Sequence, residues 1–110
     1  MGRWAQAARR SRSVPAGALG APPAPELTIP GGQANITSAY VDNVGGSVTL
    51  YQWNEEEETW VDIDFGAWAP EVVLGELGQY VTGKYYATAT GNGVNYVGES
   101  VPSNEVNLDE

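Results

Sequence analysis

The sequence contains neither cysteine nor histidine, and these two absences narrow the chemistry open to it. Without cysteine, disulfides and thiolate metal sites are excluded. Without histidine, the chain lacks the commonest general base, the usual activator of a catalytic nucleophile and the commonest transition-metal ligand. Catalysis would have to rest on carboxylates, hydroxyls and Lys84, and no two carboxylates are marked as an acid–base pair. We therefore expect a protein that is not an enzyme and that binds no cofactor or metal.

Long apolar segments are missing as well. No stretch approaches the roughly 18 apolar residues that a membrane-spanning helix needs. The first residues lack the continuous apolar core of a secretory signal. The Arg9–Arg10 pair is followed by polar residues, where a twin-arginine signal would have an apolar run. We expect a chain that is made in a cytoplasm and does not attach to a membrane.

Positive charge is scarce and confined to one end of the chain. Residues 1–25 contain four arginines and no acid, whereas residues 26–110 contain all 14 acidic residues and only Lys84. The first segment thus carries +4 and the second −13, which together give the net charge of −9. A basic tail on an acidic body is typical of a chain with two separate roles. The acidic body disfavours binding to nucleic acid.

Residues 1–25 are predicted to be an anchoring arm. Its candidate anchoring residues are one tryptophan and the arginines around it, namely Arg3, Trp4, Arg9, Arg10 and Arg12. A spacer rich in Pro, Ala and Gly follows over residues 14–25 and favours an extended conformation. Arginine beside tryptophan is a good anchor on a partner, and we favour an acidic groove of a protein shell. A disordered tail and a weak nucleic-acid-binding arm are the alternatives.

From Glu26 onward, short strand signals alternate with turn signals. Strands are predicted at 27–29, 34–41, 48–53, 60–63, 72–74 and 84–90, with a last, proline-interrupted strand over 95–101 and 105–108. Within 48–53, Val48 and Leu50 alternate with Thr49, Tyr51 and Trp53. This density of short strands predicts an all-β sandwich that forms one domain over residues 26–110.

Two stretches resemble parts of an immunoglobulin domain. Residues 83–89 (GKYYATA) resemble the G-x-Y-x-C-x-A pattern of strand F, with Tyr85 as the tyrosine corner and Ala87 replacing the second cysteine. Trp53 resembles the core tryptophan of strand C, and the first cysteine would stand near Ser38, Ala39 or Tyr40. The resemblance implies an immunoglobulin-like β-sandwich without a disulfide, whose core residues include Trp53, Tyr85 and Ala87.

The wider pattern resembles the Ig-like domains of tailed-phage structural proteins over roughly residues 26–108. The matching stretches are YQW at 51–53, WVDI at 60–63, GA at 66–67, GKYY at 83–86 and VPSN at 101–104. The resemblance implies a capsid decoration protein on the exterior of a virion. Its partners would be the major capsid protein, neighbouring copies of itself and host-surface glycans. A tail or surface adhesin for host glycans and a nucleic-acid-tethered scaffold are the alternatives.

Aromatic residues are too numerous for one small core, so some are expected to face solvent. Trp60, Trp68 and Tyr96 are candidate contacts for a glycan or a protein partner, although surface cross-strand pairs would explain them equally well. The acidic run Glu55–Glu58 is interpreted as a solvated hairpin tip. It lacks the Asp/Asn-Gly spacing of a loop that wraps around calcium.

Overall fold

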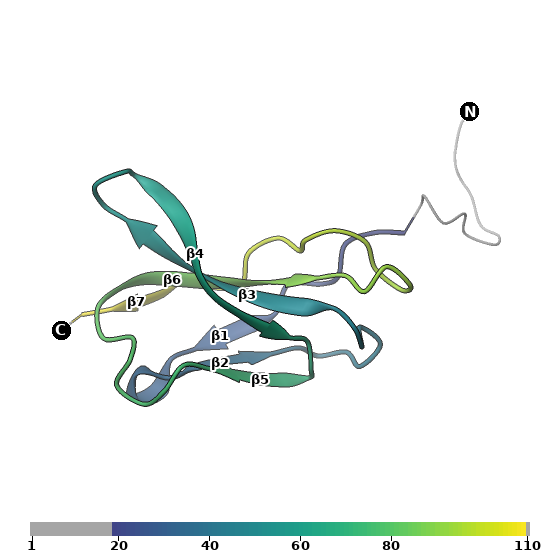
Figure 1. Cartoon of the computed structure of the whole chain (residues 1–110), viewed down its shortest axis with the longest axis horizontal. Helices are drawn as coiled ribbons and strands as arrows, with labels where there is room; N and C mark the ends of the chain where they lie inside the picture. The colour runs from purple at the N-terminus through teal and green to yellow at the C-terminus, as the bar shows by residue number, and fades with distance from the viewer. Residues whose placement is uncertain (1–18, 110) are drawn as a thin grey trace.

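Two antiparallel sheets face each other in the computed structural model, which describes residues 19–109 (Figure 1). The smaller sheet has the order β1-β2-β5, formed by β1 (Glu26–Thr28), β2 (Ala34–Thr37) and β5 (Glu71–Leu74). The larger sheet has the order β4-β3-β6-β7, formed by β3 (Ser47–Asn54), β4 (Thr59–Ala67), β6 (Gly83–Thr90) and β7 (Val106–Leu108). A single 3-10 turn, η2 (Pro30–Gly32), separates β1 from β2. The predicted all-β sandwich of about seven strands is confirmed.

The strand order is that of an immunoglobulin-like sandwich. The first, second and fifth strands form one sheet, the third, sixth and seventh form the other, and the fourth extends the larger sheet beside the third. The β3–β4 hairpin projects from one side of the body, near one end (Figure 1). At the opposite end lie the loops of residues 38–46 and 91–98, which we call the loop end.

Side-chain alternation along the strands builds the core. In the smaller sheet, Leu27, Ile36 and Val72 are direct neighbours across three strands, and all three point inward. In the larger sheet, Leu50 pairs with Ala87, and both are fully buried. Burial of each large aliphatic side chain contributes about 1.5–3 kcal/mol. The core therefore forms without a disulfide.

Trp53 does not lie in this core, so the expectation drawn from strand C is wrong. Because Val48 and Leu50 point inward and successive side chains alternate, Tyr51 and Trp53 point outward. The buried tryptophan is Trp68, just after β4, with 5% of its surface exposed.

The burial of Trp68 also contradicts its expected role as a contact for a glycan or partner. Its indole N–H donates to Ser38 Oγ over 3.2 Å, and its ring stacks on Tyr40 with centroids 5.4 Å apart. Ser38 itself lies just beyond the end of β2, and the buried residues of β2 are Ala34 and Ile36. Ser38 thus hydrogen-bonds the core tryptophan rather than occupying the position of a core cysteine.

Tyr85 has the geometry of a tyrosine corner. Its side chain is 2% exposed, and its hydroxyl donates to the Thr82 carbonyl over 2.8 Å. Gln52 Nε2 in turn donates to the Tyr85 hydroxyl over 3.1 Å. These bonds tie the start of β6 to the turn before it and to β3.

The predicted last strand divides into β7 and a segment held to β6 by serines. The N–H groups of Ser100 and Ser103 donate to the carbonyls of Ala89 and Ala87 over 2.7 and 2.8 Å. Their hydroxyls accept the N–H groups of the same two alanines over 3.0 and 2.8 Å. Pro102 lies between the serines and has no N–H to donate, and the serine hydroxyls accept the bonds that main-chain carbonyls would accept in a regular strand.

Residues 19–25 already pack on the body, N-terminal to the predicted boundary at Glu26. Pro22 and Pro25 are buried. Val97 N–H donates to the Gly20 carbonyl over 2.9 Å, and the Tyr40 hydroxyl donates to the Pro23 carbonyl over 3.1 Å. The five anchoring residues predicted between Arg3 and Arg12 lie outside the described residues.

Candidate binding face

Four aromatic side chains form a continuous row on the outward face of the larger sheet. The successive ring centroids are 5.4 Å apart for Trp53 and Trp60, 4.4 Å for Trp60 and Tyr86, and 5.0 Å for Tyr86 and Tyr51. Strand pairing produces this row, because Trp53 lies opposite Trp60 and Tyr51 lies opposite Tyr86. Each such pair adds about 0.5–1.5 kcal/mol beyond burial. We call these four residues the aromatic row.

A carboxylate is fixed at the Tyr51 end of the aromatic row. Glu99 Oε2 accepts hydrogen bonds from the Tyr51 hydroxyl and from Thr88 Oγ1, both over 2.6 Å. Bonds to an ionised acceptor are short and strong. The bond to Glu99, followed by burial, raises the pKa of Tyr51 to about 12. Glu99 remains exposed to solvent, so its charge is positioned and accessible.

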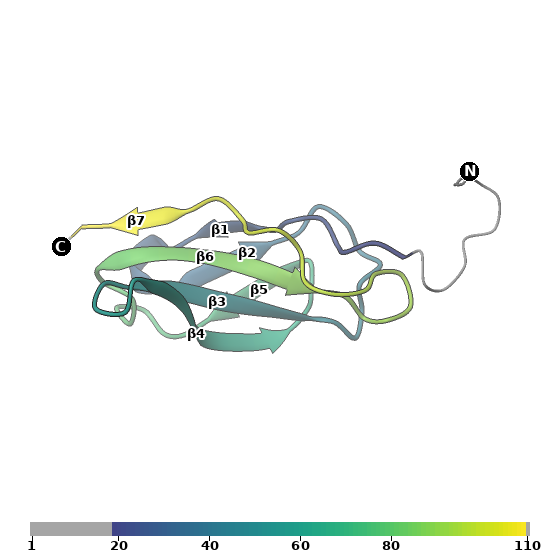
Figure 2. The same cartoon turned by 90° about the horizontal axis from the view of Figure 1, so that it is seen from above.

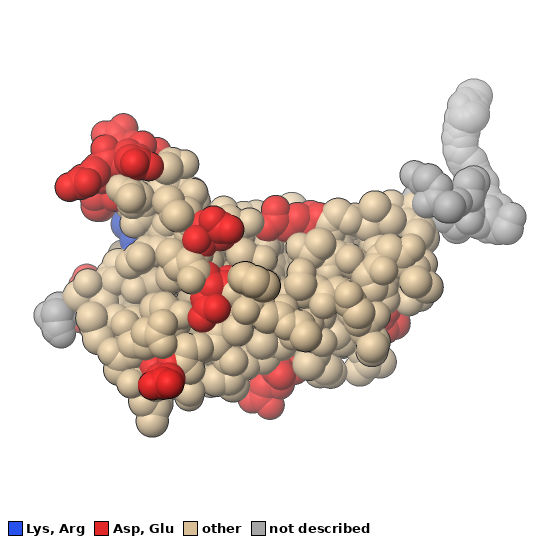
Figure 3. Space-filling model, viewed as in Figure 1, with Lys and Arg blue, Asp and Glu red and all other residues tan. Residues whose placement is uncertain are grey.

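Further acidic side chains surround the row. Asp62 lies directly opposite Tyr51 on β4 and is exposed. The exposed run Glu55–Glu58 covers the tip of the β3–β4 hairpin, where it forms the dense red cluster of Figure 3. Lys84 is the single basic residue between 19 and 109. The outward face therefore combines aromatic rings with excess negative charge.

This face suits the recognition of a cation or of a stacking ligand. A guanidinium group can stack on an aromatic ring and pair with a carboxylate at the same time. Between residues 19 and 109 no group of three or more acidic side chains is close enough together to hold a metal ion. The described part of the chain also contains no helix that is long and apolar enough to cross a membrane.

The predicted contact residues lie in three different places. Trp60 belongs to the aromatic row, and Trp68 lies in the core. Tyr96 lies at the loop end, where its hydroxyl donates to Asp42 over 2.8 Å and its ring meets Tyr40 edge-on at 5.4 Å. Tyr51 and Tyr86 belong to the aromatic surplus of the sequence but, like Glu99, are not among the predicted contact residues.

The loop end forms a second exposed surface of different chemistry. Two asparagines hold its loops together: the buried Asn43 accepts from the Asn92 N–H over 2.9 Å, and Asn92 Nδ2 donates to the Val44 carbonyl over 2.9 Å. The exposed side chains at this end include four valines, which are Val41, Val44, Val94 and Val97. Residues 19–25 run beside this surface (Figures 1 and 2).

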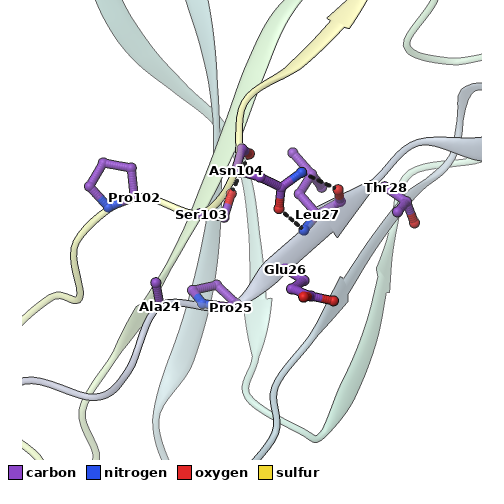
Figure 4. Close-up of a pocket in the computed structure, with 8 residues that line it drawn as sticks. All are labelled: Ala24, Pro25, Glu26, Leu27, Thr28, Pro102, Ser103 and Asn104. Atoms are coloured by element: carbon purple, nitrogen blue, oxygen red, sulfur yellow. Dashed lines mark hydrogen bonds between the residues drawn. The ribbon is translucent and has the colours of Figure 1, made fainter.

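A groove beside β1 is closed to strand addition by Asn104 (Figure 4). Asn104 Oδ1 accepts the Leu27 N–H, and Asn104 Nδ2 donates to the Leu27 carbonyl, each over 2.9 Å. These are the main-chain groups that an added strand would need. The groove is therefore a sealed edge rather than a binding site for an extended peptide.

No known protein family matches the chain, and no curated protein is detectably similar in sequence. The fold and its surfaces define a small β-sandwich of immunoglobulin-like topology with an aromatic, acidic face.

Proposed function

We propose that the protein is a non-catalytic capsid decoration protein. In this proposal the arginines of residues 1–25 bind acidic grooves of the major capsid protein, and the sandwich projects outward from the virion. Charge-assisted, bidentate contacts between guanidinium and carboxylate groups would provide the attachment.

The observation that carries the proposal is the polarity of the body. Residues 19–25 run along the loop end, whereas the acidic hairpin tip Glu55–Glu58 lies at the opposite end (Figures 1 and 3). The side of the body next to the basic arm exposes valines, which suit contact with a protein surface. The strongest acidic cluster would then face away from an acidic shell, which avoids repulsion.

Co-sedimentation of the full chain with capsids that have been stripped of it tests the proposal. Replacing the four arginines by glutamine should lower the bound amount at least about tenfold, since it removes charge-assisted contacts. Lys84→Gln, which removes a positive charge from the body instead, is the matched control and should bind like the wild type. Full occupancy by the fourfold variant would contradict the proposal.

Recognition of host-surface glycans is a second candidate function, and the aromatic row favours it. Aromatic faces stack on the C–H faces of sugar rings, and Trp53 and Trp60 are only half-buried. A glycan array read with the wild type and with Trp60→Ala would test it. Loss of a reproducible glycan signal in Trp60→Ala alone, with Val73→Ala on the other sheet as control, is the expected result. An array without signal would reject this candidate.

A further inference from the structure

We propose that the aromatic row, with Glu99 and Asp62, binds residues 1–13 of a second copy of this chain. The proposal concerns the purified protein and does not rest on attachment to a capsid. It makes the chain self-complementary: one part supplies the cations, and a different part supplies the rings and carboxylates that receive them.

Charge complementarity is the first support. Arg3, Arg9, Arg10 and Arg12 carry four of the five positive charges in the sequence and have no acid among them. The outward face of the larger sheet carries Asp62 and Glu99, and the Glu55–Glu58 tip adjoins it. Between 1 and 110, no other segment has the charge that this face would attract.

The chemistry of the face supports arginine in particular. Glu99 is held by the Tyr51 and Thr88 hydroxyls, so its carboxylate needs no reordering before it pairs with a cation. The Tyr51–Tyr86 pair beside it provides ring faces for a planar guanidinium. A flexible ammonium group gains less from such a site, because it cannot pair in a bidentate way while it stacks. Trp4 would add an aromatic anchor within the same segment.

The direction of the chain favours a second copy over the same molecule. Hydrogen bonds from Val97 N–H to the Gly20 carbonyl and from the Tyr40 hydroxyl to the Pro23 carbonyl hold residues 20–23 along the loop end. Toward Leu19, where the described part of the chain ends, the chain runs away from the β3–β4 hairpin and its acidic tip (Figures 1 and 2). A contact between the arm of one copy and the sheet face of another can be reciprocated within a pair or continued from copy to copy.

Two consequences follow. Association should grow with concentration, as any contact between two copies does. The same arginines cannot serve a shell and a neighbouring copy at once, so self-association and attachment would be alternative states of the arm.

Sedimentation velocity of the nuclease-treated full chain, over a range of concentrations, tests the proposal. At low ionic strength the weight-average mass should rise with concentration, and raising the salt from about 50 to 500 mM should weaken association at least about tenfold. The double variant Asp62→Asn, Glu99→Gln should weaken it by a similar factor. Glu26→Gln, Glu71→Gln removes the same charge from the smaller sheet and should leave association unchanged.

A charge exchange provides the positive test. One variant carries glutamate in place of Arg3, Arg9, Arg10 and Arg12, and the other carries Asp62→Lys and Glu99→Lys. Each should be monomeric alone, and a mixture should form only a one-to-one complex, because each retains one compatible half. Thermal melts of both variants establish that they are folded.

Several outcomes overturn the proposal. A wild type that stays monomeric at all concentrations does so, as does association that survives replacement of the four arginines by glutamine. Association that disappears on nuclease treatment would assign the arm to nucleic acid instead. A change in Trp fluorescence on arginine replacement that is independent of concentration would assign the contact to a single molecule.

Discussion

At the scale of single residues, Trp53 and Trp68 show how position rather than residue type decides a side chain's role. Trp68 is 5% exposed, packs on Tyr40 and donates its indole N–H to Ser38. Trp53 is half-buried and touches Trp60 on the outer face of the larger sheet. Truncation of the first opens a cavity inside the core, whereas truncation of the second exposes a neighbouring ring.

We therefore expect Trp68→Ala to cost about 3–5 kcal/mol of the free energy of unfolding, as for other buried tryptophans. Trp53→Ala should cost less than about 2 kcal/mol, since it loses one partly exposed aromatic contact. Urea denaturation of both variants measures the two values. The comparison requires that the free energy of unfolding falls with urea concentration at the same slope in both variants. Equal costs for the two substitutions would contradict the assignment of Trp68 as the core tryptophan.

The side chain of Asn104 makes the hydrogen bonds that the main chain of a neighbouring strand would make. It pairs with both main-chain groups of Leu27, which is 1% exposed. Asn104→Ala leaves a buried N–H and a buried carbonyl unpaired, and each unpaired group costs about 1–3 kcal/mol.

Denaturation and amide exchange at Leu27 check this expectation. The Leu27 amide should exchange faster in Asn104→Ala than in the wild type, even when the two proteins are compared at the same free energy of unfolding. Asn107→Ala, which truncates an exposed asparagine on β7, is the control and should change neither quantity. Unchanged exchange at Leu27 in the Asn104 variant would show that the Asn104 side chain does not protect this amide.

At the scale of elements, the turn between β3 and β4 contains local strain. Glu58 adopts a φ of 54°, the left-handed region, and it is the one non-glycine residue between 19 and 109 that does so. For an L-residue this conformation costs about 1–2 kcal/mol, which glycine does not incur.

Glu58→Gly should therefore be more stable than Glu57→Gly by about 1–2 kcal/mol. The two variants lose the same charge from the same turn and gain the same freedom in the unfolded chain, so their difference isolates the backbone conformation. Thermal and urea unfolding measured side by side provide that difference. A Glu57→Gly variant that is as stable as Glu58→Gly would show that the turn relaxes around Glu58 without strain.

Element boundaries could be predicted where alternation is regular. Residues 48–53 and 84–90 predict β3 (Ser47–Asn54) and β6 (Gly83–Thr90) closely, because apolar and polar side chains alternate there. β4 runs to Ala67, beyond the predicted 60–63. The sequence hides this extension because the polar Asp64 points inward and the apolar Phe65 points outward, the reverse of the usual alternation. Between Leu50 and Tyr51 the pairing with β4 also shifts by one residue.

The candidate face was only partly predictable. The surplus of aromatic residues predicts an exposed Trp60, but the likeness of Trp53 to an immunoglobulin tryptophan predicts a core position, which is wrong. The alternation of side chains along 48–53 predicts otherwise: with Val48 and Leu50 in the core, Trp53 faces outward. Glu99 could not have been found, because it reaches Tyr51, 48 positions away, through a segment that is neither helix nor strand.

At the scale of the whole molecule, charge is separated along the chain and tyrosines are paired with acids on the body. The Tyr51 hydroxyl donates to Glu99, and the Tyr80 hydroxyl donates to Asp64 over 2.9 Å. Burial, followed by the bond to Asp64, raises the pKa of Tyr80 to about 12. Burial also raises the pKa of Tyr85. Ionisation of any of them adds negative charge to residues 26–110, which already carry a formal charge of −13.

The last prediction is that the protein loses stability in alkali, with a constant free energy of unfolding near neutral pH. The pKa of a tyrosine in an unfolded chain is about 10, whereas in the folded state the pKa of Tyr51 and of Tyr80 is raised to about 12. Between these values the unfolded chain binds fewer protons than the folded one, so the free energy of unfolding falls as pH rises. Below pH 10 both states hold these protons, and the contribution is fully present.

Urea unfolding at several pH values from neutrality to about 12 measures this dependence, with tyrosinate absorbance recorded in parallel. Tyr51→Phe and Tyr80→Phe should each flatten the alkaline decline, because each removes one group whose pKa differs between the two states. Thr49→Ala, an outward-facing residue on β3 without a titrating group, should leave the decline as steep as in the wild type. A wild-type stability that stays constant through pH 12 would mean that neither tyrosine has a raised pKa in the folded state.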